Sequence, residues 1–456
     1  MTSAGETSER RPVFTYSPDR RTALILCGTG AHGAYHAGVL RALQEAGVKL
    51  DVLAGQGIGA GAAAIAAIDG TARLWEPNGV WRQPAARRLY GWTRPLLASV
   101  ALSGIALLAL LVPLLLVASG ISIPLLPFLL TALASVAAVV AVLARGDGSA
   151  RRSRGPWFWR VLGAPIDAGS ARALFTGAIW DLIRGAAPVP RPPATQLARR
   201  YAELLAENLG QPGFRELIVV ATDVDARRDV IAALLAEPYR QDFLAPRPGR
   251  DRRTEVLDLA GVGRDHALDV VAAALTPPLA ADPYLVTFAP DSFWRGERHR
   301  LCDRPAALSR LMEEVASAGV SQAIVVSAVA TAPAPHRLRS PGLDVRQRLG
   351  EMVAADEAAA LRDALEMARL RYDSIYVICP AHNPVGPFDV GGAYDEASDR
   401  RQDVVELMER AYEDAYRQFI EPVVGASGDH LARPAPIDKD ADHGRERVFD
   451  DADTRG

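Results

Sequence analysis

Charge is absent from one long stretch of this sequence. Residues 95–144 contain no Asp, Glu, Lys, Arg or His, although 23% of the whole chain is charged. A membrane-spanning helix needs about 20 apolar residues. The stretch holds two such segments, Leu96–Ala118 and Leu125–Ala144, on either side of a short break. We therefore expect a helical hairpin that crosses a membrane; the alternative is a pair of helices buried in a soluble core.

Arginine is crowded at both ends of this stretch and missing from its turn. The flanking arginines are Arg82, Arg87, Arg88 and Arg94 on one side, and Arg145, Arg151, Arg152 and Arg154 on the other. Because positive residues beside spanning helices stay on the cytoplasmic side, both ends of the hairpin should be cytoplasmic. The sequence thus predicts a multi-pass protein with two spanning helices in a bacterial membrane, its main domain in the cytoplasm.

Cysteine is scarce as well. Cys27, Cys302 and Cys379 are far apart and odd in number, which excludes a disulfide framework and a cysteine metal site. The net charge of -3 leaves no basic footprint for nucleic acid. We expect no metal, no cofactor and no nucleic-acid partner, and membrane lipids as the main partners.

The composition divides the chain into segments with different expected roles. We expect a disordered N-terminus (1–20), a first part of an α/β domain (21–92), the membrane hairpin (93–150), an amphipathic connector at the membrane interface (151–194), the rest of the domain (195–424) and a disordered tail (425–456). The aromatic cluster 157–159 is predicted to be an interfacial anchor.

The pattern of apolar residues indicates strands that alternate with helices. Residues 22–30 form a strand running into a glycine turn, and 34–46 a helix; 50–54 and 60–68 repeat the pattern. Further helices are expected at 195–209, 265–275, 306–318, 355–369 and 400–420, and strands at 216–222, 322–329 and 374–379. This order is typical of a parallel sheet covered by helices.

A glycine-rich turn follows the first strand. Gly28, Gly30 and Gly33 let backbone N–H groups line a helix N-terminus, where they can hold a phosphate or a reaction oxyanion. A dinucleotide site would have an acidic residue at the end of the second strand. Here Asp51 stands at the start of that strand instead, which disfavours a nucleotide.

A second glycine motif follows the second strand. Gly55, Gly57 and Gly59 have the spacing of a nucleophile elbow, whose outer glycines permit a strained turn between strand and helix. Together the two motifs resemble the patatin-like phospholipases, in which a glycine-rich oxyanion loop precedes the elbow at this spacing. The resemblance implies a three-layer α/β/α domain, here with the hairpin inserted, and hydrolysis of acyl esters by a Ser–Asp dyad.

The resemblance also implies roles for individual residues. Asp303, ahead of the helix expected at 306–318, matches the family's catalytic aspartate, and Asp389 is a weaker rival. Residues 216–223 resemble a strand of the family that ends in Thr-Asp. The oxyanion loop would consist of Gly28, Thr29, Gly30, Ala31, His32 and Gly33, and the elbow of Gly55, Gly57 and Gly59.

The sequence departs from the family at each motif. Gly57 occupies the position of the serine nucleophile and has no side chain. Thr29 replaces a glycine and His32 an arginine of the oxyanion loop, while residues 304–305 are Arg-Pro in place of small residues. We therefore expect impaired hydrolysis, because an elbow without a nucleophile forms no acyl-enzyme.

Other reactive side chains have simpler interpretations. Cys27 ends an apolar strand and should be a core residue. His32 and His36 should belong to the helix start and surface rather than to a metal site, since no third ligand is evident. His299 is expected to be a charged loop residue.

Two classes of function therefore remain in competition. The first is a membrane-anchored relative of the lipid acyl hydrolases that binds lipid or fatty acyl groups in the old cleft. The second is a membrane scaffold or regulatory protein whose α/β domain binds a protein partner. A nucleotide-binding domain at Gly28–Gly33 is a third, less favoured hypothesis.

Overall fold

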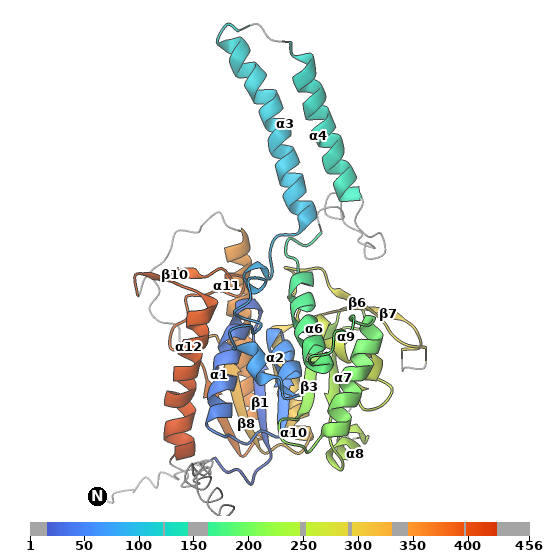
Figure 1. The fold of residues 1–456 in the computed structure, drawn as a ribbon, viewed down its shortest axis with the longest axis vertical. Coiled ribbons are helices and arrows are strands. Elements are labelled where there is room, and N and C mark those ends of the chain that lie inside the picture. The colour runs from blue at the N-terminus through green and yellow to red at the C-terminus, as the bar shows by residue number, and fades with distance from the viewer. Residues whose placement is uncertain are drawn as a thin grey trace, which may run out of the picture.

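The computed structural model describes residues 16–121, 124–144, 163–246, 252–290, 294–330, 345–395 and 398–425. Within them, a central sheet is flanked by helices, and a helical hairpin projects from one end of the domain (Figure 1). The aromatic cluster 157–159, the arginines at 145–154, residues 1–15 and residues 426–456 lie outside the described residues.

The sheet is rich in parallel pairs. Its order is β5-β4-β3-β2-β1-β8-β9, and β7 joins β6 to β3. The strands are β1 (Thr22–Cys27), β2 (Val52–Gly55), β3 (Glu216–Asp223), β4 (Arg228–Leu234), β5 (Thr254–Asp258), β6 (Tyr284–Thr287), β7 (Arg298–Cys302), β8 (Gln322–Ser327) and β9 (Ser374–Ile378). The parallel α/β sheet predicted from the sequence is therefore present, with antiparallel pairing where β3 meets β4 and β7.

The helices cover both faces of the sheet. They are α1 (Gly33–Glu45), α2 (Ile58–Ala66), α6 (Gly169–Arg184), α7 (Ala194–Asn208), α8 (Tyr239–Leu244), α9 (Ala267–Ala274), α10 (Leu308–Ser317), α11 (Val345–Ala368) and α12 (Val404–Ala415). Alternate residues of β1 enter two separate buried clusters: Leu24 and Leu26 join one, Ala23 and Ile25 the other. This alternation shows that β1 is buried on both faces, as a central parallel strand should be.

The expected interfacial connector is in part a core element. Phe175 and Trp180 of α6 are buried, and Phe175 packs edge-to-face against Trp81. Gly61 of α2 makes room for this contact, because a Cβ there would lie 2.5 Å from the Phe175 ring. The aromatic residues of α6 therefore serve the core of the domain and not a membrane surface.

Two helix boundaries differ from the prediction. Helix α11 begins at Val345, ten residues before the predicted start. Helix α12 begins only at Val404, because residues 400–402 form strand β11 (Arg400–Gln402) against β10 (Ala393–Asp395). Asp403 then caps the helix by accepting hydrogen bonds from the amides of Val405 and Glu406.

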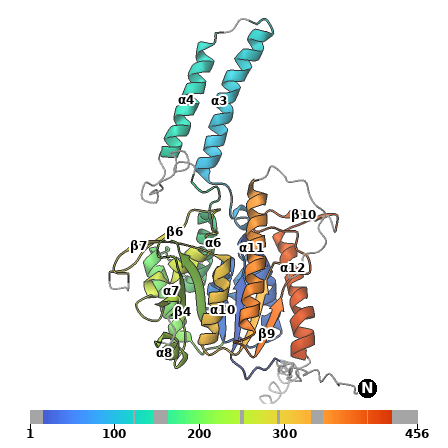
Figure 2. The ribbon, with the colours of Figure 1, turned by 180° about the vertical axis from the view of Figure 1, so that it is seen from behind.

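The uncharged stretch forms two helices that run side by side away from the domain (Figure 2). They are α3 (Arg94–Ala118) and α4 (Leu126–Ala144). Helix α3 is long and apolar enough to cross a membrane. The apolar stretch of α4, Leu126–Ala141, falls short of that length. By length and composition, the described residues support one spanning helix, not the two that we expected.

The contact between α1 and α12 depends on one glycine. A Cβ at Gly38 would lie 2.0 Å from the carbonyl oxygen of Met408. We expect Gly38→Ala to lower the free energy of unfolding by about 1–3 kcal/mol, the usual cost of overpacking. Gly177→Ala on α6, where nothing lies within 4 Å of the added methyl group, should instead raise it by about 1 kcal/mol through helix propensity.

Thermal unfolding of the detergent-purified variants, followed by circular dichroism, measures both effects. Equal melting temperatures for Gly38→Ala and the wild type would contradict the proposed helix contact.

Candidate functional site

The elbow after β2 has the strained turn that the glycine pattern predicts. Gly57 has φ 60° and ψ -132°, and α2 begins at the next residue. A Cβ at Gly55 would lie 2.4 Å from Cα of Ala60, and one at Gly59 would lie 2.2 Å from the Leu26 carbonyl oxygen. Gly55 is therefore required by the tight turn from β2 into α2, and Gly59 by the close approach of α2 to β1.

The glycine loop after β1 lies directly against this elbow. Strands β1 and β2 are parallel neighbours, with Leu26 opposite Gly55. The amide of Ile58 donates a 2.7 Å hydrogen bond to the carbonyl oxygen of Gly28. The structure thus brings the two predicted motifs together at the carboxyl ends of adjacent strands, where open α/β sheets hold their ligands.

Asp303 reaches the same point from the end of β7. Its side chain is buried, and its Oδ2 would lie 3.1 Å from a Cβ at position 57. Gln56 Nε2 donates a 2.5 Å hydrogen bond to Oδ1, and Thr29 Oγ1 lies 3.5 Å from Oδ2. A serine at position 57 would therefore stand beside this carboxyl group.

The rival aspartate has a structural role in a different loop. Asp389 accepts a hydrogen bond from the amide of Gly386 and so closes a turn in the segment between β9 and β10. This is the structural role expected of an aspartate in a loop.

Burial controls the protonation of Asp303. Loss of solvent raises the pKa of its carboxyl group to about 7, against an opposing hydrogen bond from Gln56, and the nearby negative charge of Glu357 raises it further. The carboxyl group is therefore about half protonated near neutral pH. Such a pKa suits a general base, but the elbow offers no hydroxyl group for it to deprotonate.

Two of the amides that could stabilise an oxyanion are already bonded within the protein. Ala31 N–H donates a 2.7 Å hydrogen bond to the carbonyl oxygen of Pro387, and Ile58 N–H donates to Gly28. Pro387 approaches so closely that a Cβ at Gly30 would lie 1.9 Å from its oxygen. Both amides donate to carbonyl groups of the chain itself, so neither is free to donate to a substrate oxyanion.

Helix α11 closes the remaining space above the elbow. Glu357 and Ala360 from this helix line a cavity of about 10 Å³ beside Cys27, Gly28 and Gln56. A cavity of this size holds about one water molecule. No ester or acyl chain fits there in the described part of the chain.

The histidines of the loop are buried, contrary to our expectation of surface residues. His32 Nδ1 lies 3.0 Å from Glu357 Oε2, and both side chains are almost fully buried. His36 Nε2 lies 3.0 Å from the carbonyl oxygen of Cys27, and burial lowers the pKa of His36 to about 3. Each ring is thus tied to the protein, and no cluster of metal ligands occurs among the described residues.

The other reactive candidates are also held in structural contacts. Cys27 is a buried core residue whose Sγ lies 3.3 Å from the Val326 carbonyl oxygen. His299 stands on β7 and not in a loop, between Asp223 (2.5 Å) and Glu297 (3.1 Å). Burial of this ring lowers its pKa, but the two carboxylate hydrogen bonds outweigh burial, so the pKa of His299 is raised.

A nucleotide site at the glycine loop finds no support in this geometry. The Ala31 amide, which would face a phosphate, is bonded to Pro387. Asp51 accepts a hydrogen bond from the Thr22 amide at the opposite end of β1, so it is far from any ribose at this loop.

Sequence reasoning missed three residues of the site. Gln56 stands between two glycines of the elbow, and its side chain donates a hydrogen bond to Asp303. Glu357 and Pro387 come from segments that resemble the family loosely, and no local pattern connects them to the glycine loop.

One protein family matches part of the chain. Residues 24–237 match the family model of the patatin-like phospholipases. The matched segment, slightly less than half of the chain, holds the glycine loop, the elbow and the hairpin. Asp303 lies beyond it, so its place in the site rests on geometry. No curated protein matches the chain.

Two solved structures show low similarity to the whole chain. VipD from Legionella pneumophila shares 14% identity, with 89% of this chain and 67% of that one covered and a TM-score of 0.30. ExoU in complex with SpcU, from the type III secretion system of Pseudomonas aeruginosa, shares 15% identity, with 66% and 58% covered and a TM-score of 0.19.

The raised pKa of Asp303 predicts a pH-dependent stability. Between about pH 4 and 7 the folded chain keeps a proton that the unfolded chain loses, so stability falls as the pH rises through this window. Asp303→Asn removes this cost. We expect the variant to be more stable than the wild type by up to about 4 kcal/mol at pH 8 and equally stable at pH 4.

Chemical unfolding of both proteins across this pH range measures the difference. If the free energy of unfolding differs between the two proteins by the same amount at every pH, Asp303 ionises as freely in the folded chain as in the unfolded one, and the prediction is wrong.

Proposed function

We propose that this chain is a membrane-anchored patatin-like protein that does not hydrolyse esters and acts by binding at the membrane surface. The observation that carries the proposal is the elbow itself. Gly57 occupies the nucleophile position beside Asp303, so the site has a base but nothing for it to activate.

The oxyanion amides support the same proposal independently. Ala31 N–H and Ile58 N–H are satisfied by Pro387 and Gly28. A substrate oxygen would have to displace both carbonyl groups and leave them unpaired, which costs roughly 1–3 kcal/mol for each buried group. These two donors are therefore unavailable to a substrate oxyanion, in addition to the missing nucleophile.

The packing of the hairpin supports a membrane location for both of its helices. On α3 the buried side chains are Ser99, Ala106, Ala109 and Pro113, and on α4 they are Ala132 and Ser135. The large apolar side chains point outward instead, among them Leu107, Leu108 and Leu133. Small residues inside and leucines outside are the arrangement that helices adopt in lipid and not in water.

Arginines at the base of the hairpin support a cytoplasmic domain. Arg87, Arg88 and Arg94 are exposed and precede or begin α3. By the preference of positive residues for the cytoplasmic side, the α/β domain would lie there and only the neutral turn would cross.

Absence of hydrolysis is tested on the purified protein with short acyl esters. We expect no turnover by the wild type and none by Gly57→Ser, because the serine Cβ would meet the Gly28 carbonyl oxygen at 2.2 Å and the oxyanion amides stay engaged. Gly57→Ala adds the same Cβ without the hydroxyl group and controls for misfolding. Robust wild-type hydrolysis that Asp303→Ala abolishes would overturn the proposal.

Membrane anchoring is tested by alkaline carbonate extraction. The full-length protein should stay in the membrane pellet, since exposed leucines on both helices favour the bilayer. Deletion of residues 95–144 should release most of it into the supernatant. Complete extraction of the intact protein by carbonate would refute the anchor.

A further inference from the structure

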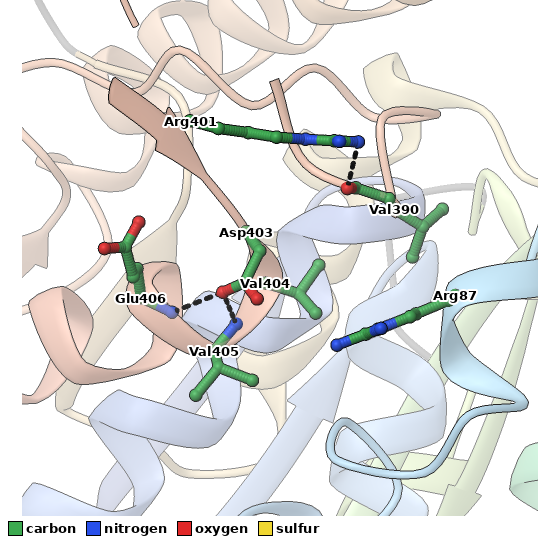
Figure 3. A pocket seen from close by; sticks show the side chains of 8 residues that line it. Arg87, Val390, Arg401, Asp403, Val404, Val405 and Glu406 are labelled. Carbon is green, nitrogen blue, oxygen red and sulfur yellow. Dashed lines mark hydrogen bonds between the residues drawn. The ribbon is translucent and has the colours of Figure 1, made fainter. Parts of the chain in front are cut away.

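A second cavity lies away from the elbow, between the segment before α3 and the start of α12. Its volume is about 770 Å³. Arg87 and Arg401 approach it from different segments, and Val390, Val404 and Val405 supply apolar wall (Figure 3). It is large enough for a small charged group with an apolar extension, unlike the space at the elbow.

The positive charges of this cavity are less engaged than its negative ones. Arg87 has no hydrogen bond or ion pair with any other described residue, and Arg401 donates only to the Gly391 carbonyl oxygen, at 2.7 Å. Asp403 Oδ1 is occupied by the amides of Val405 and Glu406.

The second carboxylate of the wall is engaged through one of its oxygens. Glu406 Oε1 lies 3.5 Å from Nη1 of Arg400, while Oε2 is buried without a hydrogen-bond partner among the described residues. The two guanidinium groups still offer more unused donors than the carboxylates offer unused acceptors, which favours an anion with several acceptor oxygens.

The cavity lies at the hairpin end of the domain. Arg87 comes shortly before α3, and the base of the hairpin is fixed where the Thr93 amide donates to Pro165. Strand β10 and the start of α12 lie toward the same end in both views (Figures 1 and 2). In a membrane-anchored chain this end faces the lipid headgroups.

We infer that this cavity binds the phosphate group of a membrane phospholipid, with Arg87 and Arg401 as the recognising residues. The guanidinium groups would donate to phosphate oxygens, and the three valines would contact the glycerol and the first carbons of the acyl chains. The inference rests on the proposed membrane anchor. It gives the binding function a site and a ligand class.

Lipid binding is measured by native mass spectrometry of the full-length protein in mild detergent, titrated with phosphatidylglycerol. We expect one retained lipid on the wild type. Arg87→Gln and Arg401→Gln should each weaken retention about tenfold, since a hydrogen bond to a charged group contributes about 1.5–3 kcal/mol. Diacylglycerol, which lacks the phosphate, should not be retained.

Arg215→Gln is the matched control. Arg215 lies just before the amino end of β3, lines another cavity and likewise donates to a main-chain carbonyl group, that of Phe214. Retention by this variant should equal that of the wild type. Equal retention by all the arginine variants, or an equal loss in Arg215→Gln, would overturn the inference.

Glycerol 3-phosphate distinguishes a lipid from a soluble phosphate ester. It should compete with phosphatidylglycerol only weakly, because it lacks the acyl carbons that meet the valines. If glycerol 3-phosphate binds as tightly as phosphatidylglycerol, the ligand is a soluble phosphate ester and not a membrane lipid. Carbonate extraction of the double variant Arg87→Gln/Arg401→Gln separates the two proposals. The variant should stay in the membrane pellet. If it does, and its lipid retention equals that of the wild type, the lipid site is refuted and the membrane anchor is not.

Discussion

The close contact between the glycine loop and the elbow is the constraint on which the site depends. The bond from Ile58 N–H to the Gly28 carbonyl oxygen joins the ends of β1 and β2 where both strands are buried. Glycines at 55 and 59 permit this contact, since any side chain there would meet backbone atoms. The same bond that fixes the two motifs also consumes an amide that hydrolysis would need.

Buried polar side chains surround the elbow. Gln56 and Thr29 both donate to Asp303, and His32 pairs with Glu357 from α11. Such groups are costly to bury unless each finds a partner. Each of these side chains has at least one hydrogen-bond partner, which offsets much of the cost of burying polar groups beside the elbow.

The sequence predicted the fold better than the site. Strong periodicity located β1, α1, β2 and α2 within about two residues, because local propensity and burial agree there. The location of α6 was predicted wrongly, because its aromatic face suits a membrane interface as well as a core. The start of α12 was also predicted wrongly, because pairing of β11 with β10 displaces it. Glu357 and Pro387 reach the glycine loop through tertiary contacts that no local pattern encodes.

The position of the hairpin also sets an order on biosynthesis. Strand β2 ends at Gly55, and its parallel neighbour β3 begins at Glu216, with the entire hairpin between them. The centre of the sheet therefore cannot close until the apolar segment has left the ribosome, and closing so long a loop is entropically slow to begin. During synthesis β1 and β2 therefore wait with an open sheet edge while the apolar hairpin is made, so early shielding of the hairpin would protect the chain against misfolding.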